Sequence, residues 1–303
     1  MVSISIKAGT MKPQTFIQNL KNIVGHDYVL HEPEDLIVFE YDGSVDKALP
    51  TVVVLPKTTK EVSEVVKVAK KHNLPIVARG SGTGLSGGAI AEEGGIVLTL
   101  TRMTEIIEID SDNNLAIVEP GVINLSLTSA TSKYGLYFAP DPSSQKACTI
   151  GGNVAENSGG PHCLAYGVTT NHILGMEVVL ADGSTQWFGG KTREFPGYDL
   201  RGILIGSEGT LGIVTKVIVR LLKQPEAVKT LLAVFSKIEN ASAAVSGIIA
   251  AGIVPAAIEM MDQLCIEAVE AGLHAGFPEG AGAVLLVEVD GLREEVDEES
   301  IEI

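Results

Sequence analysis

Cysteine is scarce in this chain of 303 residues, and its spacing excludes two kinds of stabilised protein. The three cysteines, Cys148, Cys163 and Cys265, are odd in number and widely spaced. Neither a disulfide framework nor a tetrahedral zinc site has that pattern. We therefore expect a reducing compartment, no bound metal, and packing roles for Cys148 and Cys163.

Positive charge is scarce as well. Lys and Arg number 22 against 38 Asp and Glu, which leaves a formal net charge of −16 at neutral pH. A surface this acidic repels the phosphates of nucleic acids and the head groups of anionic lipids. We therefore expect no nucleic-acid partner.

Long apolar runs are also missing. Charged residues make up 20 % of the chain and interrupt its apolar segments, so we expect no transmembrane segment. Residues 1–17 lack the long apolar core of a signal peptide. These absences predict a cytoplasmic protein.

With 45 % apolar residues, the chain is long enough for roughly two domains with buried cores.

Glycine, by contrast, is abundant and unevenly placed. Many of the 33 glycines fall into three groups, at 80–95, 151–167 and 202–212. Glycine is selected where the backbone needs a positive φ, or where it must touch a ligand with no side chain in the way. The three groups are therefore candidate ligand-binding segments.

The pattern around these groups mixes helix and strand. The β-branched run 51–55, the helical apolar spacing of 58–72 and the run 74–78 predict a βαβ unit. Asp182-Gly183, between two strand-like runs, predicts a hairpin with a type I′ turn. After residue 225, strands and helices alternate in a second unit that ends in an acidic helical segment. We expect an α+β fold whose loops carry the function.

The first glycine group contains the spacing G-x-G-x-x-G at residues 82–87, so a Rossmann site has to be considered. That motif must open a helix, and 89–95 is too short to form one before the next strand. We favour an anion-binding nest, in which backbone N–H groups and the hydroxyls of Ser81, Thr83 and Ser86 hold a pyrophosphate, with Arg79 adding one charge. A flexible surface loop is the simpler alternative.

The second and third groups extend the ligand. Residues 141–160 offer small side chains and amides with few charges, and 207–214 lead into a strand whose apolar start would lie against an adenine or a ring edge. A dinucleotide with a large ring system would use all three segments.

Four motifs in this order resemble a known family. The runs 50–56 (PTVVVLP), 79–88 (RGSGTGLSGG), 149–155 (TIGGNVA) and 209–215 (GTLGIVT) are similar to the FAD-binding domain of FAD-linked oxidases of the vanillyl-alcohol-oxidase or p-cresol-methylhydroxylase type. The resemblance covers about residues 20–222. Within that family, 159–168 (GGPHCLAYGV) and 255–262 (PAAIEMMD) are most similar to the FAD subunits of bacterial glycolate oxidases and to D-lactate dehydrogenases.

The resemblance implies an FAD held between two α+β subdomains under a cap domain. It divides the chain into an N-terminal helical or extended segment (1–48), an FAD-binding domain (49–225) and an incomplete cap (226–303). It also implies oxidation of a D-2-hydroxy acid, glycolate or D-lactate, by hydride transfer to flavin N5. Electrons would pass to a separate acceptor, an iron–sulfur or other subunit, and such partners would bring the chain to the membrane periphery.

The candidate FAD-binding residues come from the three segments. They are Arg79, Gly80, Ser81, Gly82, Thr83, Gly84, Leu85, Ser86, Pro140, Asp141, Ser144, Thr149, Gly151, Gly152, Asn153, Ala155, Asn157, Gly159, Gly160, Gly209, Thr210, Gly212, Ile213 and Val214.

No catalytic residue is assigned. The substrate arginine, the histidine-containing metal motif and the base of the family are not found in these 303 residues, so the chain is expected to be truncated. His162, in the flavin-loop region, and His172, at the start of an apolar strand, are interpreted first as structural. The alternative function is an FAD-binding fragment or split subunit without independent catalysis. A reductase of cell-wall precursor synthesis, which shares this fold, is a third hypothesis, and 259–262 (EMMD) argues against it.

Overall fold

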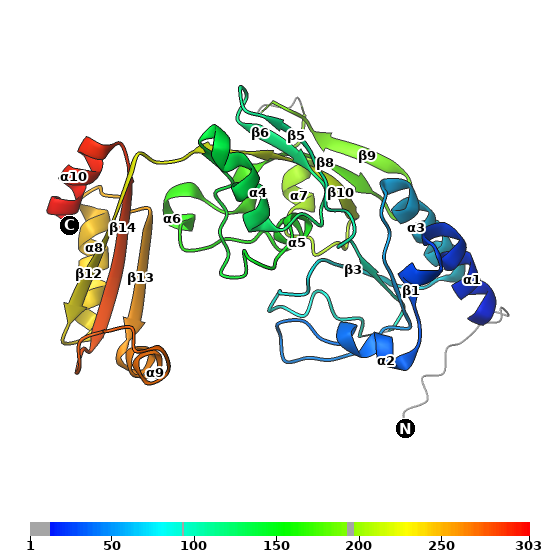
Figure 1. Ribbon diagram of the computed structural model, residues 1–303, viewed down its shortest axis with the longest axis horizontal. Helices are drawn as coiled ribbons and strands as arrows, with labels where there is room; N and C mark the ends of the chain where they lie inside the picture. Colours follow the sequence, from blue (N-terminus) through cyan, green and yellow to red (C-terminus); the bar gives the residue numbers. More distant parts are fainter. Residues whose placement is uncertain (1–12, 93, 193–196) are drawn as a thin grey trace. The chain divides into compact units, whose positions relative to one another are not determined.

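A computed structural model describes residues 13–92, 94–192 and 197–303 (Figure 1). The chain forms two compact units from interleaved segments. The first unit contains Met1–Leu127, Ser144–Ser158 and Ile173–Arg220, and the second contains Thr128–Ser143, Gly159–His172 and Leu221–Ile303. The fold mixes helices and sheets, as an α+β protein does.

The first unit contains the predicted βαβ arrangement. Strands β2 (Val52–Val54) and β3 (Ile76–Arg79) both pair in parallel with β4 (Ile96–Thr99), and helix α3 (Thr59–His72) connects them. Strand β1 (Val29–Leu30) pairs with β2 on the far edge, in the order β1-β2-β4-β3. All residues of β2 and β4 are buried, as is usual for parallel strands covered on both faces.

Helix α3 forms where the apolar spacing predicts it. The Thr58 side chain accepts a hydrogen bond from the N–H of Glu61 and caps the start, and Asn73, in the left-handed region, ends the helix. Its apolar side is buried, and α1 (Pro13–Val24) packs beside it. Of the expected N-terminal segment 1–48, residues 1–12 lie outside the described residues, and β1 adds an antiparallel edge strand to the sheet of β2, β4 and β3.

An antiparallel sheet completes the first unit, in the order β5-β6-β10-β8-β9. Its strands are β5 (Ile106–Asp110), β6 (Leu115–Val118), β8 (Ile173–Val179), β9 (Thr185–Gly189) and β10 (Ile213–Arg220). The hairpin predicted around Asp182-Gly183 is present between β8 and β9, and a second hairpin joins β5 to β6.

The turn of the hairpin between β8 and β9 differs from the prediction. Gly183 has φ +82°, but Asp182 does not have a positive φ, and the N–H of Gly183 donates to the carbonyl of Leu180 over 2.8 Å. The loop between Leu180 and Ser184 has three residues, whereas a type I′ turn has two, so the predicted turn type is wrong. The Asp182 carboxylate accepts hydrogen bonds from the N–H (2.8 Å) and the hydroxyl (2.6 Å) of Ser184. These bonds favour a negative φ at Asp182, which a type I′ turn does not allow.

The second glycine group is partly helical, although its sequence was expected to form a loop. Residues expected to form a loop build α5 (Ile150–Glu156), capped by the Thr149 side chain on the N–H of Gly152 and ended by Asn157 at φ 51°. Two adjacent glycines lower helix propensity, but Gly151 packs so tightly on Pro120 that a Cβ would collide with it. Tertiary packing therefore outweighs local preference.

The second unit contains a three-stranded antiparallel sheet in the order β12-β14-β13. Its strands are β12 (Ala227–Phe235), β13 (Ala257–Asp262) and β14 (Ala283–Gly291), and its helices are α8 (Ile238–Ala250), α9 (Gln263–Leu273) and α10 (Arg293–Glu302). This confirms the alternation predicted after residue 225. Buried Leu285 and Val287 pack with apolar residues of α8, while α9 packs near Val284 on the other face.

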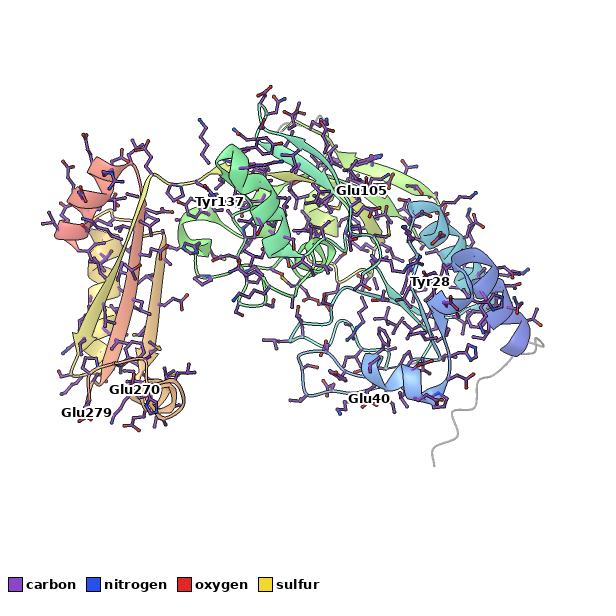
Figure 2. The ribbon with its side chains drawn as sticks, viewed as in Figure 1. Tyr28, Glu40, Glu105, Tyr137, Glu270 and Glu279 are labelled. Carbon is purple, nitrogen blue, oxygen red and sulfur yellow. The ribbon has the colours of Figure 1, made fainter. Side chains whose placement is uncertain are left out.

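Earlier residues also belong to the second unit. Strand β7 (Leu136–Tyr137) pairs with β11 (Leu222–Lys223), and α6 (Cys163–Tyr166) contacts β13. Tyr137 is labelled in Figure 2. Its ring meets that of Tyr166 edge-on, with centroids 6.4 Å apart.

The remaining helical elements are short. They are α2 (Pro33–Leu36), α4 (Asn124–Thr131), α7 (Leu200–Leu204), η1 (His26–Tyr28), η2 (Ile37–Phe39), η3 (Ser132–Tyr134) and η4 (Thr169–His172). None of the helices in the described part of the chain combines the length and apolarity that crossing a membrane requires.

Candidate cofactor site

Residues from all three glycine groups meet in the first unit. Gly80, directly after β3, lies so close to Thr149 at the start of α5 that a Cβ would collide with its hydroxyl. The Ser86 hydroxyl donates to Oε2 of Glu156 over 2.9 Å. From the third group, the N–H of Gly206 donates to the carbonyl of Val154 (2.9 Å). Helix α5 therefore lies between the other two segments.

The structure agrees with the exclusion of a Rossmann site. After the loop 80–88, the described residues 89–92 and 94–95 form turns that lead into β4, and no helix follows the G-x-G-x-x-G spacing. The phosphate-binding helix that a Rossmann site requires is therefore absent from this described segment.

Arg79 lies under the loop instead of projecting from it. Only 7 % of the residue is exposed, and its guanidinium fills the space where Gly82 would carry a Cβ. It lies 5.7 Å from the centroid of the Phe39 ring, and Nη1 donates to the carbonyl of Ala89 over 3.4 Å. Burial lowers the pKa of Arg79, and the Asp42 carboxylate acts in the opposite direction. Arg79 therefore supports the loop from inside.

A segment before β2 also contacts the loop, and the sequence reading missed it. The N–H of Gly43 donates to the carbonyl of Gly84 over 2.8 Å. Asp42 is buried; its Oδ1 accepts a hydrogen bond from the N–H of Ser44 (2.7 Å), and its Oδ2 has no hydrogen-bond partner among the described residues. A buried carboxylate oxygen without a donor is costly, so it marks a position where a polar ligand would fit. In sequence, Asp-Gly-Ser signals only a turn.

Gly84 differs from the other glycines of its loop. Gly82 and Gly87 have φ of +71° and +79°, which favour glycine for backbone reasons. Gly84 has no positive φ, and the nearest atom to a Cβ would be Oε1 of Glu156, 3.8 Å away. Nothing in the described chain requires glycine at 84, whereas a ligand lying against the backbone would. An extended cofactor therefore fits here, beside the exposed Leu85 and Ser81.

Several candidate residues are buried within the chain. Thr149 and Asn153 are 2 % and 1 % exposed, and Thr149 serves as the cap of α5. Ile213, the apolar residue expected to meet a ring edge, packs into the hydrophobic core of the first unit. The exposed and half-buried candidates of this unit are Gly80, Ser81, Gly82, Thr83, Gly84, Leu85, Ser86, Ser144, Gly151, Gly152, Ala155, Asn157, Gly209, Thr210, Gly212 and Val214.

Four candidates belong to the second unit: Pro140, Asp141, Gly159 and Gly160. Gly160 packs on Asp141 so closely that a Cβ would collide with the aspartate carbonyl and carboxylate, and its N–H donates to Sγ of Cys163 over 2.9 Å. A Cβ on Gly159 would collide with the same sulfur. Packing within the chain is therefore enough to explain both glycines.

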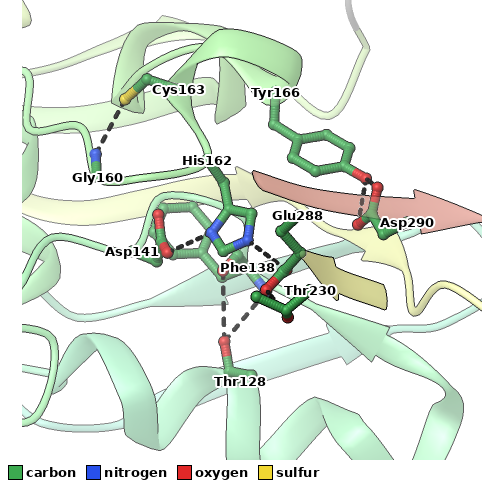
Figure 3. A network of polar contacts seen from close by, with 10 residues as sticks. All are labelled: Thr128, Phe138, Asp141, Gly160, His162, Cys163, Tyr166, Thr230, Glu288 and Asp290. Carbon is green, nitrogen blue, oxygen red and sulfur yellow. Dashed lines mark hydrogen bonds and ion pairs between the residues drawn. The ribbon is translucent and has the colours of Figure 1, made fainter. Parts of the chain in front are cut away.

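His162 lies between two carboxylates (Figure 3). Its Nδ1 is 2.6 Å from Oδ2 of Asp141, and its Nε2 is 2.9 Å from Oε1 of Glu288. The hydrogen bond to Asp141 is the main cause that raises the pKa of His162 to about 9; burial opposes it and Glu288 adds to it. His162 is therefore protonated at neutral pH and cannot serve there as the base that accepts a substrate proton.

Two other residues considered from the sequence, His172 and Cys148, are buried. His172 is buried and its Nε2 lies 2.8 Å from the carbonyl of Tyr166, consistent with packing. Burial raises the pKa of the Cys148 thiol, which makes it a poor nucleophile. Among the described residues, no group of three or more His, Cys, Asp or Glu is arranged to hold a metal ion.

Two protein families match the chain. The FAD binding domain matches residues 50–189, and the C-terminal domain of FAD linked oxidases matches residues 224–303. The first match contains the first two glycine groups, and the second contains the three-stranded sheet. The matches follow the change of character that the sequence shows near residue 225.

Among curated relatives, the glycolate oxidase subunit GlcD of Escherichia coli (strain K12) is 47 % identical over 272 residues, which cover 89 % of this chain and 54 % of the relative. GlcD of Bacillus subtilis (strain 168) is 47 % identical, covering 86 % and 56 %. The D-lactate dehydrogenase of Archaeoglobus fulgidus is 42 % identical, covering 71 % and 48 %. The chain spans about half the length of the curated relatives it matches.

Solved structures show the same fold. An alkyldihydroxyacetonephosphate synthase superposes with a TM-score of 0.82 at 23 % identity, over 99 % of this chain and 60 % of that one. A substrate-bound p-cresol methylhydroxylase gives 0.80 at 21 % identity, over 97 % and 64 %. At such identities the likeness shows the fold alone. The two matched domains and the relatives show that this chain belongs to the FAD-linked oxidases, a family of FAD-dependent oxidoreductases.

Proposed function

We propose that the exposed and half-buried candidates of the first unit bind FAD. The observation that carries this proposal is the convergence of residues from the three glycine groups around α5, together with Gly84, a glycine for which the chain itself supplies no structural reason. The buried Oδ2 of Asp42 supports it, because a ligand hydroxyl or N–H would supply the missing donor. For Pro140, Asp141, Gly159 and Gly160, the proposal rests on the sequence resemblance.

When bound, FAD supplies a ring that accepts a hydride from the substrate carbon. The contribution of this chain is orientation. Backbone N–H groups of 80–88 and the hydroxyls of Ser81 and Thr83 would hold the phosphates, in a protein whose net charge of −16 supplies no positive field. Arg79 and the segment 42–44 keep that loop in place.

We further propose oxidation of a D-2-hydroxy acid, glycolate or D-lactate, with electrons passed to a separate iron–sulfur or other acceptor subunit. The names of the relatives, glycolate oxidase subunit and D-lactate dehydrogenase, support this substrate class. An alternative is that the chain binds FAD but does not turn over by itself. The protonated state of His162 favours the alternative, because it removes the one histidine of the flavin-loop region as a base.

A matched pair of glycine variants tests FAD binding. Gly84 and Gly190 both lack a positive φ, and a Cβ at Gly190 would have no atom within 4 Å. Gly84→Ala should therefore leave the melting temperature unchanged but weaken FAD binding by about tenfold, because the added methyl group occupies space needed by the cofactor. Gly190→Ala should change neither.

Binding is measured by quenching of flavin fluorescence, and turnover by anaerobic bleaching of the flavin absorbance with glycolate or D-lactate. If the wild-type chain binds no FAD, the proposal fails. If it binds FAD but neither acid bleaches the flavin, the alternative without independent turnover is correct.

A further inference from the structure

In the second unit, a short helix is attached to the central strand of the sheet at two points (Figure 3). His162 directly precedes α6 and Tyr166 ends it, while Glu288 and Asp290 occupy alternate positions on β14. Alternate residues of a strand face the same side. Nε2 of His162 lies 2.9 Å from Oε1 of Glu288, and the Tyr166 hydroxyl donates to the Asp290 carboxylate over 2.6 Å. We call these two contacts the β14 latch.

The geometry of His162 determines its charge. Its two ring nitrogens lie 2.6 Å and 2.9 Å from carboxylate oxygens of Asp141 and Glu288. A neutral imidazole has one N–H, so only the imidazolium ion donates to both carboxylates. Hydrogen bonds between ionised groups are about twice as strong as neutral ones. His162 is thus a charged link between residue 141 and residue 288.

Asp141 is held from its other side as well. Gly160 packs directly on it, and the Gly160 N–H is bound by Cys163 at the start of α6. Just before it in sequence, the N–H of Phe138 donates to the hydroxyl of Thr128 over 3.2 Å. Asp141, Gly160 and α6 therefore form one tight cluster, and the latch connects this cluster to the sheet.

We propose that His162 is a positioning residue, which holds Asp141 and the Gly159-Gly160 pair at a set place on strand β14 so that these residues can bind FAD. Tyr166 supplies the second point of attachment and prevents α6 from pivoting about His162. The inference rests on the proposed FAD binding and deepens it. It gives residues of the C-terminal sheet a part in cofactor binding that their sequence does not indicate.

The latch depends on pH. The titratable groups around His162 are Asp141 in the preceding segment, Cys163 and Tyr166 on α6, Glu288 and Asp290 on β14, Tyr137 on β7, and Glu259 on the same sheet face of β13. On β12, Thr230 donates to Glu288 over 3.4 Å. The nearby carboxylates favour the imidazolium, and burial with the Asp290 contact raises the pKa of Tyr166. The latch is intact at neutral pH and is lost as pH rises through about 9.

The test measures the Kd of FAD from neutral to alkaline pH for the wild type and for His162→Gln, Glu288→Gln and their double variant. Glu259→Gln is the matched control, since it removes a carboxylate from the same sheet face without touching the latch. We expect His162→Gln to weaken binding by about tenfold at neutral pH and to abolish the loss of affinity above pH of about 9. The double variant should be no weaker than His162→Gln alone, and Glu259→Gln should match the wild type.

A merely structural role would lower the melting temperature of His162→Gln and leave both its neutral-pH affinity for FAD and the pH profile of Kd at the wild-type values. That result would overturn the inference, whether or not the melting temperature changes, and would leave the proposed FAD binding intact. If the wild type binds no FAD, both the inference and the proposed function fail.

Discussion

The two units of this protein each hold a paired ionised side chain, but with opposite charge. In the first unit, the carboxylate of Glu177 on β8 accepts hydrogen bonds from the hydroxyls of Thr59 (2.7 Å) and Thr215 (2.9 Å) and from Nζ of Lys216 (3.1 Å). In the second unit, the imidazolium of His162 donates to two carboxylates. Because one ion is lost in acid and the other in alkali, pH should act on the two units separately.

The units also differ in how their sheets are buried. Every residue of β4 is buried, whereas every residue of β12 is half-buried or exposed. A strand whose residues are buried on both faces gains most of its stability from apolar burial, and a strand without buried residues gains less. The first unit is therefore the part in which a core substitution should cost most.

Leu98→Ala, on β4, should have the largest effect. The side chain is fully buried in the centre of the parallel sheet, and its loss leaves a cavity, so we expect the free energy of unfolding to fall by about 2–5 kcal/mol. The control is Leu232→Ala on β12, which is 47 % exposed and should cost less than about 1 kcal/mol. Urea denaturation followed by circular dichroism measures both. An equal loss of unfolding free energy in the two variants would contradict the inference that the sheets differ in how much apolar burial stabilises them.

Glu177→Gln should have the second-largest effect on stability, and it should change how stability depends on acid pH. Burial works to raise the pKa of Glu177, but hydrogen bonds from Thr59, Lys216 and Thr215 outweigh it and hold the pKa below its ordinary value of 4.5. The carboxylate therefore adds stability above that value and loses it as pH falls. We expect the variant to be destabilised by about 1–3 kcal/mol at neutral pH and to show a shallower acid transition.

Melting temperatures across an acid series measure that difference. Glu108→Gln is the control, because its ion pair with Lys191 is short, at 2.7 Å, but both side chains are 40 % or more exposed. Exposed pairs contribute little, so this variant should lose less than about 1 kcal/mol. An acid transition of Glu177→Gln identical to that of the wild type would contradict the role given to Glu177.

His162→Gln should have the smallest effect on stability, and it should change how stability depends on alkaline pH. The pKa of His162 is raised to about 9, so its contribution is complete below its ordinary value of 6.5 and disappears as pH rises through about 9. With the ring partly exposed, we expect about 1 kcal/mol. Thermal unfolding should show the stability of the wild type declining between pH 6.5 and about 9, and no such decline for the variant. Tyr166→Phe, which keeps His162, should retain the decline.

Local pattern was enough to predict much of the fold. The apolar positions of 58–72 repeat at helical spacing, and α3 forms there; the change near residue 225 marks the start of the three-stranded sheet. Where prediction failed, tertiary contacts outweighed local preference. Helix α5 forms despite Gly151-Gly152 because it packs on Pro120, and Asp42 was missed because nothing local shows that its carboxylate is buried beside the glycine loop.

By itself, the sequence indicated a dinucleotide ligand, because backbone that must approach one tolerates few residues other than glycine. The resemblance of four motifs to those of FAD-linked oxidases gave the class of the protein. Only the tertiary structure decided what individual charges do. Arg79 is buried under its own loop, and His162 is charged because Asp141, 21 residues away, and Glu288, 126 residues away, both face its ring. Burial and pairing set protonation, and both depend on residues that are remote in the chain.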